Sequence, residues 1–109
     1  MKIKVIENND QIKKSTEKNV IVDFYANWCG PCKVLSKTLD MISAESSVDD
    51  VLVLKVNVDE YPDLASEYNV RSLPTLVFLS SGEVIKNKVG NVSKNDLEDM
   101  IKEAYKNEN

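Results

Sequence analysis

Cys29 and Cys32, separated by Gly30 and Pro31, are the only cysteines in a chain that has no histidine. In a reducing compartment, a lone pair at this spacing is more typical of redox catalysis or metal binding than of a structural disulfide. A tetrahedral metal site would need two chains that each give two thiolates, because no second Cys-x-x-Cys motif is present. We therefore favour a redox-active pair over a metal site.

The Cys-x-x-Cys segment follows an apolar run and precedes residues with helical periodicity, which places it at a helix N-terminus. The first turn of a helix offers unpaired backbone N–H groups and the positive end of the helix dipole, which favour a thiolate there. Residues three apart lie on one helix face, so little backbone movement would bring Cys29 and Cys32 within disulfide distance. Pro31 fits the first turn, where its missing N–H costs nothing. The pattern predicts a reversible disulfide.

One carboxylate interrupts the apolar run over residues 20–26. Asp23 is flanked by Ile21-Val22 and Phe24-Tyr25. One interpretation is a carboxylate at a sheet edge or facing solvent. An acid inside an apolar strand is more often a buried group with a chemical role, and burial raises the pKa of such a group. We therefore favour Asp23 as a functional acid and expect its pKa to lie above the ordinary value.

Hydrophobic periodicity divides the chain into alternating strands and helices. Strands are predicted over residues 3–6, 20–26, 51–59, 75–80 and 83–89. Helices are predicted over residues 9–18, from Cys29 past Ile42, from Pro62 to Tyr68, and from Ser93 to Tyr105. The first of these helices has only Ile12 as an apolar residue, whereas the last opens with a capping box, Ser93-Lys94-Asn95-Asp96.

Strands that alternate with helices are typical of an α/β protein with a parallel sheet covered on both faces. The last two strands differ from this pattern. Ser81-Gly82 between them is a hairpin signal, which adds an antiparallel pair. The expected sheet is therefore mixed, and its strand order does not follow from the sequence pattern.

The chain of 109 residues fits one domain, residues 1–109, in which residues 106–109 form a frayed polar tail. Apolar residues make up 42% of it, enough for a core, and no run is long enough to span a membrane. The net charge of −4 argues against a nucleic-acid-binding protein. The first ten residues have charges threaded through their apolar stretch and lack a cleavage site, unlike an export signal. We expect a cytoplasmic monomer.

Three segments resemble those of the thioredoxin family. The stretch Val22-Asp23-Phe24-Tyr25-Ala26-Asn27-Trp28-Cys29-Gly30-Pro31-Cys32-Lys33 is similar to the family's active-site segment. Arg71-Ser72-Leu73-Pro74-Thr75 is similar to its cis-proline loop, and Val89-Gly90 to the third element of its cleft. The likeness covers essentially the whole chain, and it is far more specific than a bare Cys-x-x-Cys pair. It implies a thioredoxin fold, with a central mixed sheet of about five strands flanked by about four helices.

The resemblance also implies a role for each matching residue. Cys29 would be the attacking thiolate and Cys32 the resolving thiol, with Asp23 accepting the proton of Cys32. Gly30 and Pro31 would modulate this chemistry. Lys55 is by default a solvated strand residue, but the family places a lysine near the buried aspartate, so a modulating role for Lys55 is the alternative interpretation. Pro74 would be cis, and the substrate-binding cleft would be lined by Trp28, Leu73, Pro74, Val89 and Gly90.

The implied activity is that of a thiol-disulfide oxidoreductase, which reduces disulfides in client proteins such as peroxidases or reductases through a redox-active Cys29–Cys32 disulfide. An NADPH-dependent flavoprotein, a thioredoxin reductase, would regenerate the dithiol, so no bound cofactor and no metal is expected. Two alternatives stay open: a dedicated electron donor to one enzyme, and an interaction module in which the thiols are incidental. Gly30-Pro31 and the lack of an export signal argue against an oxidase of the periplasmic kind.

Three positions depart from the family pattern. Tyr25 stands where many members have tryptophan, which changes spectroscopic properties more than chemistry. Lys37 replaces a proline that commonly kinks the long helix, so this helix is expected to be straighter. Asn91 follows Gly90 where a small apolar residue is usual, which makes one edge of the cleft more polar.

Overall fold

The computed structural model describes residues 1–45, 48 and 50–106. Strands and helices alternate within these residues in the predicted order. The strands are β1 (Lys2–Val5), β2 (Asn19–Tyr25), β3 (Leu52–Asn57), β4 (Thr75–Ser80) and β5 (Glu83–Val89). The helices are α1 (Gln11–Lys14), α2 (Gly30–Ala44), α3 (Pro62–Glu67) and α4 (Lys94–Ala104). Of the predicted frayed tail, residues 107–109 lie outside the described residues.

The five strands form one mixed sheet with the order β1-β3-β2-β4-β5. Strand β3 pairs in parallel with β1 and with β2, whereas β4 pairs antiparallel with β2 and with β5. The hairpin between β4 and β5 turns at Ser81 and Gly82, whose φ angles of 48° and 86° suit a tight turn of this kind. The predicted mixed sheet and its hairpin are therefore confirmed.

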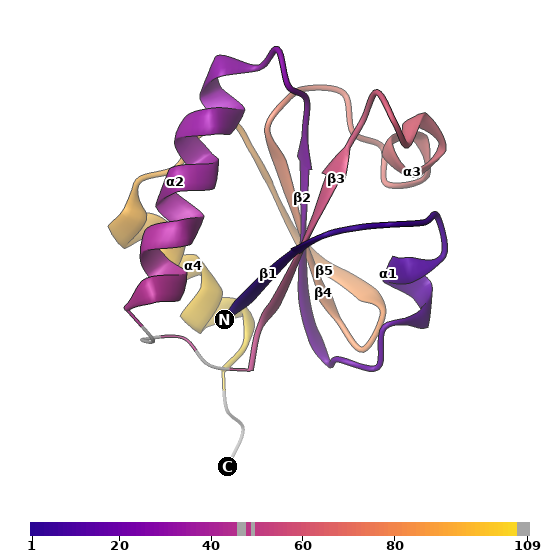
Figure 1. Ribbon diagram of the computed structural model, residues 1–109. Coiled ribbons are helices and arrows are strands. Elements are labelled where there is room, and N and C mark those ends of the chain that lie inside the picture. The colour runs from indigo at the N-terminus through magenta and orange to yellow at the C-terminus, as the bar shows by residue number, and fades with distance from the viewer. Residues whose placement is uncertain (46–47, 49, 107–109) are drawn as a thin grey trace.

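Helices cover the sheet on both faces, α2 and α4 on one face and α1 and α3 on the other (Figure 1). Side chains of β2 alternate between the two layers. Ile21 packs with residues of α2 and α4, while the Phe24 ring lies 5.7 Å from that of Tyr68 in the other layer. Asp23 and Tyr25 share the α2 face with Ile21, because every second side chain of a strand points the same way. Burial on both faces explains why β2 is a nearly continuous apolar run.

The first helix is much shorter than predicted. The predicted range was residues 9–18, but α1 contains only Gln11–Lys14, and the chain becomes extended at Ser15. Ile12 is the one buried residue of α1, and the Asp10 side chain makes no capping hydrogen bond. A longer helix here would have neither an apolar face nor a cap to stabilise it.

Strand β3 also ends before the predicted residue, because the chain turns directly after Asn57. The backbone N–H groups of Glu60 and Tyr61 both donate to the Asn57 carbonyl oxygen. The Asp59 backbone N–H donates to Asn57 Oδ1 at 2.9 Å. This turn takes Asp59 out of the strand and leaves it at the surface, at the carboxyl end of β3.

Helix α2 carries the second cysteine and is the longest of the described helices. Leu35, Leu39 and Ile42 of its predicted apolar face are buried, but Val34 and Met41, which the spacing of apolar residues adds to that face, are exposed. The helix continues without interruption through Lys37, but its curvature relative to helices with proline there stays a prediction. No helix in the part of the chain that the structure describes is long and apolar enough to cross a membrane.

Helix α4 begins as its capping box predicts, with Ser93 Oγ accepting a hydrogen bond from the Asp96 N–H at 3.1 Å. Tyr105 directly follows the helix. Its hydroxyl oxygen lies 2.9 Å from the carbonyl oxygens of both Val20 and Leu79. These two residues are register partners in β2 and β4, so the hydroxyl group bridges two central strands.

Candidate active site

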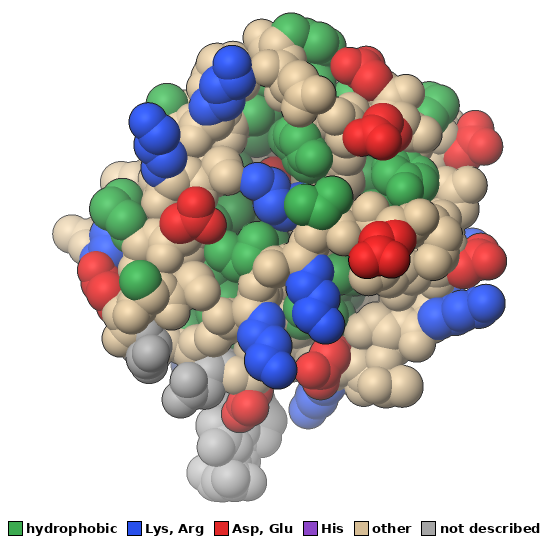
Figure 2. Space-filling model, viewed as in Figure 1, with side chains coloured by type: hydrophobic (Ala, Val, Ile, Leu, Met, Phe, Trp, Pro, Cys, Tyr) green, Lys and Arg blue, Asp and Glu red, His purple; other side chains and the backbone are tan. Residues whose placement is uncertain are grey.

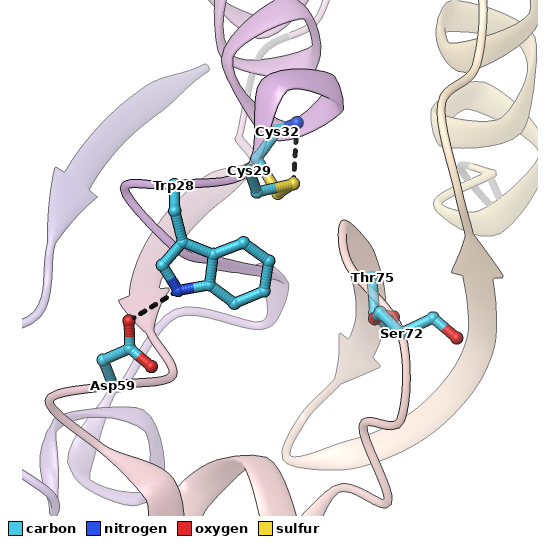
Figure 3. Close-up of a disulfide and its surroundings, with 6 residues drawn as sticks. All are labelled: Trp28, Cys29, Cys32, Asp59, Ser72 and Thr75. Atoms are coloured by element: carbon cyan, nitrogen blue, oxygen red, sulfur yellow. Dashed lines mark hydrogen bonds between the residues drawn. A yellow bond between two sulfur atoms is a disulfide. The ribbon is translucent and has the colours of Figure 1, made fainter.

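The two cysteines form a disulfide at the junction between β2 and α2 (Figure 3). Their Cα atoms are 5.3 Å apart, within the ordinary range for a disulfide. Cys29 is the N-cap residue of α2, and Pro31 lies in the first turn. Both cysteines are buried in this oxidised form, so neither is markedly closer to solvent than the other.

The first turn of α2 places a hydrogen-bond donor against the sulfur of Cys29. The Cys32 backbone N–H donates a hydrogen bond to Cys29 Sγ at 3.2 Å (Figure 3). The sulfur thus takes the place of a capping oxygen, where free N–H groups and the helix dipole favour an anion. When the disulfide is reduced, this position favours the thiolate of Cys29, which is the nucleophilic form of a cysteine.

Asp23 is buried on the α2 face of β2, with 1% of its surface exposed. Neither carboxylate oxygen has a hydrogen-bond partner among the described residues. Desolvation raises the pKa of Asp23 to about 6, and the positive charge of Lys55 partly opposes this rise. The direction is the one predicted from the sequence. A carboxyl group with such a pKa can exchange protons near neutral pH.

Lys55 of β3 is the register partner of Asp23, so both side chains lie on the sheet face that α2 covers. The Lys55 ammonium group donates a hydrogen bond to Ser36 Oγ at 2.7 Å and lies 5.0 Å from the centroid of the Tyr25 ring. Ser36 is one helical turn after Cys32. The sequence analysis missed Ser36, because a serine inside a helix gives no local signal of such a contact.

Trp28 lies on the solvent side of the disulfide, with 71% of its surface exposed. Its indole Nε1–H donates a hydrogen bond to Asp59 Oδ2 at 2.9 Å (Figure 3). The sequence analysis also missed Asp59, which it placed inside a strand. The signal that could have found it is topological: β2 and β3 are parallel, so the residues after their carboxyl ends meet at one edge of the sheet.

The cis-proline loop and the end of β5 meet beside the disulfide. The peptide bond between Leu73 and Pro74 is cis, as the resemblance implied. The Gly90 backbone N–H donates to the Pro74 carbonyl oxygen at 2.8 Å. Gly90 has a φ angle of 88°, in the left-handed region that favours glycine, and Val89 before it is exposed. Leu73 packs against the buried cluster that contains both cysteines, so the loop adjoins the disulfide.

A groove of about 510 Å³ runs beside the exposed tryptophan. Trp28 and Leu73 line it together with apolar side chains of the segment from β3 to the cis-proline loop, among them Val58, Pro62, Ala65 and Val70. The predicted cleft residues Pro74, Val89 and Gly90 do not line this groove. The structure therefore brings the predicted residues to one end of the sheet, but only two of them share the groove.

The charged groups of the described residues show neither a cluster suited to a metal ion nor a continuous basic area on the face seen in Figure 2. Among the described residues, no group of three or more histidine, cysteine, aspartate or glutamate side chains is placed to hold a metal ion. Lysine, arginine, aspartate and glutamate side chains are interspersed over the face shown in Figure 2, and none of these types forms a continuous area there. A mixed surface of this kind gives no electrostatic attraction for a nucleic-acid backbone.

Comparison with known sequences gives one consistent family. The family model described as Thioredoxin matches residues 2–103. A thioredoxin from Mycoplasmoides gallisepticum is 41% identical over 88 residues, which cover 81% of this chain and 86% of that protein. A thioredoxin from Buchnera aphidicola is 42% identical over 104 residues, which cover 92% of this chain and 95% of that protein.

Solved structures share the fold as well. A mutant thioredoxin from Halobacterium salinarum has a TM-score of 0.83 at 35% identity, with 94% of this chain and 90% of that chain covered. The thioredoxin of Malassezia sympodialis has a TM-score of 0.82 at 38% identity, with coverages of 92% and 88%. From the family match, these similarities and the Cys29–Cys32 disulfide, we conclude that the chain belongs to the thioredoxin family and is a thiol-disulfide oxidoreductase.

Proposed function

We propose that this chain reduces disulfides in client proteins, with Cys29 as the attacking thiolate and Cys32 as the resolving thiol. The observation that supports these roles most directly is the hydrogen bond from the Cys32 N–H to Cys29 Sγ at the N-terminus of α2. It places a donor of the helix against the sulfur of Cys29. Because this donor stabilises a thiolate, Cys29 is the better nucleophile of the pair.

The reaction transfers two electrons in two exchange steps. In the first step, the Cys29 thiolate attacks one sulfur of the client disulfide, a mixed disulfide forms, and the other client sulfur leaves as a thiolate. In the second step, Cys32 loses its proton and attacks Cys29 Sγ, and the second client sulfur leaves as a thiolate. The client is reduced to a dithiol after protonation, and the chain reaches the oxidised form that the structure shows.

Asp23 is proposed to accept the proton that Cys32 loses in the second step, through an intervening water molecule. Its support is the burial that raises the pKa of Asp23 to about 6, which suits a group that must take up and release a proton near neutral pH. Lys55 is proposed to modulate this group, because its positive charge opposes the rise.

Clients are proposed to bind in an extended conformation across Trp28, Leu73, Pro74, Val89 and Gly90. Two of these side chains, Trp28 and Val89, are exposed although they are apolar, which is typical of a surface that receives a partner. The backbone beside Pro74 is proposed to pair with the client. Asn91, directly after this surface, adds a polar edge that favours clients with a hydrogen-bonding group there.

A thioredoxin reductase, an NADPH-dependent flavoprotein, is proposed to return the disulfide to the dithiol, so that the chain itself binds no cofactor. Gly30 and Pro31 are proposed to set the balance between the dithiol and disulfide forms, because they form the turn that separates the two sulfurs. We further propose that residues 1–109 act as one domain and as a cytoplasmic monomer.

The direct test is the reduction of insulin by dithiothreitol, followed as turbidity. Wild type should accelerate the reaction, and Cys29→Ser, the matched control, should leave it at the uncatalysed rate. An interaction module with incidental thiols would leave wild type at that rate too, which would contradict the proposal. Replacing dithiothreitol by NADPH and a thioredoxin reductase tests the proposed partner. A dedicated donor would differ in a lysate, where Cys32→Ser would trap one client instead of several.

A further inference from the structure

The Lys55 ammonium group lies between α2 and the sheet, bonded to Ser36 Oγ at 2.7 Å and 5.0 Å from the centroid of the Tyr25 ring. Asp23 is the register partner of Lys55 on the neighbouring strand. The two charged groups nevertheless make no hydrogen bond, since both Asp23 oxygens lack a partner among the described residues. The cation is therefore bonded to a neutral hydroxyl group while a buried carboxylate beside it stays unpaired.

We propose that Ser36 is a positioning residue that holds the Lys55 ammonium group off the Asp23 carboxyl group, which leaves Asp23 able to take up and release a proton. This inference rests on the proposed role of Asp23 as the proton acceptor for Cys32. Ser36 itself touches neither cysteine sulfur in this assignment. It acts through the lysine alone.

A direct ion pair would work against the proposed role of Asp23. Coulomb attraction grows as two charges approach and as the surroundings become less polar, so an ammonium group in contact would strongly favour the charged carboxylate. In the observed arrangement Lys55 only partly opposes desolvation, and the pKa of Asp23 stays at about 6. The Ser36 hydroxyl oxygen and the face of the Tyr25 ring give the ammonium group two neutral partners instead.

The side chains that surround Asp23 determine which charge acts on its pKa. On this side of the sheet, the packed elements α2, β2, β3 and β4 present Cys32, Ser36, Tyr25, Lys55 and Leu76. The Tyr25 phenol is neutral near pH 7, because desolvation, and then the charges of Glu60 and Asp23, raise its pKa further above 10. Leu76 carries no charge. Within the described residues, Lys55 is thus the cation that acts on Asp23.

The first test compares Ser36→Ala with its conservative control, Ser36→Thr. The alanine variant removes the hydroxyl partner of the ammonium group, which can then turn toward the unpaired carboxylate of its register partner Asp23, so the carboxyl titration of Asp23 should move down by about one pH unit or more. Carbon-13 NMR of the Asp23 carboxyl group in the oxidised protein measures this directly. Ser36→Thr keeps the hydroxyl group and should titrate like wild type. An unchanged or upward-shifted titration in Ser36→Ala would overturn the proposal.

The second test removes the lysine. Lys55→Met should raise the Asp23 titration, and adding Ser36→Ala in that background should have no further effect, because no ammonium group remains to be released. A downward shift that persists without the lysine would show that Ser36 acts by another route and would overturn the proposal.

These titrations do not depend on enzymatic activity. They therefore test the role of Ser36 separately from the proposed role of Asp23 as proton acceptor. The pH profile of mixed-disulfide resolution in wild type tests Asp23 as proton acceptor. If that profile showed no transition near pH 6, the role of Asp23 would be wrong, whereas the Ser36→Ala titration would still decide whether Ser36 holds Lys55. If Asp23 is the acceptor, the transition should move to lower pH in Ser36→Ala, together with the NMR titration.

Discussion

Two aspartates lie close to the same disulfide and differ in almost every physical respect. Asp23 is buried, lacks a hydrogen-bond partner among the described residues, and has a pKa raised to about 6. Asp59 is exposed and accepts the indole hydrogen bond of Trp28. The same type of side chain is thus an unpaired buried acid in one place and the hydrogen-bond acceptor of an exposed indole in the other. Surroundings, more than residue type, assign the role.

The comparison extends to the residues around each aspartate. The inner side, which we define as Asp23, Cys32, Ser36 and Lys55, lies between α2 and the sheet, and burial of Asp23 makes nearby charges act more strongly on it. The outer side, defined as Cys29, Trp28, Asp59 and the cis-proline loop, adjoins the groove that is open to partners. We assign proton transfer to the inner side and client recognition to the outer side. Substitutions on each side test whether the two roles are separate.

The largest effect should come from replacing one cysteine at a time. Cys29→Ser removes the attacking thiolate, so turnover should fall to the uncatalysed rate and no client should be trapped. Cys32→Ser still attacks but cannot resolve, so mixed disulfides should accumulate on a non-reducing gel. Release of clients by Cys32→Ser at the wild-type rate would contradict the separate roles of the two sides.

Asp23→Asn should change stability in a pH-dependent way. The folded protein binds the Asp23 proton more tightly than the unfolded chain, since the pKa rises from 3.8 to about 6. Wild type therefore loses stability as the pH rises from about 4 to about 6 and loses no more above that, up to about 3 kcal/mol in total. Above pH 6, Asp23→Asn should be the more stable protein by as much as this amount.

Urea unfolding of the oxidised proteins between pH 4 and pH 8 measures that difference. Asp59→Asn is the matched control, because it makes the same change from carboxyl to amide at an exposed position. A constant difference between wild type and Asp23→Asn over the same range would show that Asp23 does not titrate as a buried group.

A smaller effect is expected from the glycine that adjoins the cis-proline loop. Gly90→Ala forces a side chain into the left-handed conformation at φ 88°, which should cost about 1–2 kcal/mol of unfolding free energy. Gly30→Ala is the control, because Gly30 does not adopt the left-handed conformation and the added carbon meets no atom within 4 Å beyond its chain neighbours and the backbone of its own helix. It should be neutral or stabilising by up to about 1 kcal/mol, as alanine is the better helix former. Equal losses in the two variants would contradict this reasoning.

The smallest change in stability should follow Asp59→Ala. An exposed hydrogen bond contributes little, so unfolding free energy should fall by less than about 1 kcal/mol. The freed indole should nevertheless raise the KM for a protein client several-fold and shift the emission of Trp28, the only tryptophan in the chain. Asp99→Ala, on the exposed side of α4, is the control and should change neither. A lower kcat without a change in KM would show that Asp59 acts in the chemical steps and not in client recognition, which would contradict its place on the outer side.

Local signals in the sequence predicted the elements that hold the site. The apolar run predicted β2, the periodicity of Leu35, Leu39 and Ile42 predicted α2, and Ser81-Gly82 predicted the hairpin. Each of these elements depends on contacts between residues near in sequence or on burial of a continuous pattern. The prediction failed for the helix over residues 9–18, where Ile12 was the only apolar residue and no pattern supported the length.

The contacts that complete the site could not be predicted in this way. The bond of Trp28 to Asp59 and that of Lys55 to Ser36 join residues that are distant in sequence, so no local pattern marks them. The cis form of Pro74 followed only from the family resemblance, because few proline peptide bonds are cis. The strand order could not be predicted for a similar reason. Strands β1 and β3 pair although they are distant in sequence, and hydrophobic periodicity does not encode such pairing.

The hydroxyl group of Tyr105 has a consequence for how the chain folds as it is made. Tyr105 lies beyond every strand in the sequence, yet it bridges Val20 and Leu79 in the middle of the sheet. A ribosome releases the chain from the N-terminus, so the two paired strands emerge long before the residue whose hydroxyl group contacts both of them. We expect the native state to be completed only after residue 105 has left the exit tunnel, and a nascent chain that is shorter to remain sensitive to protease.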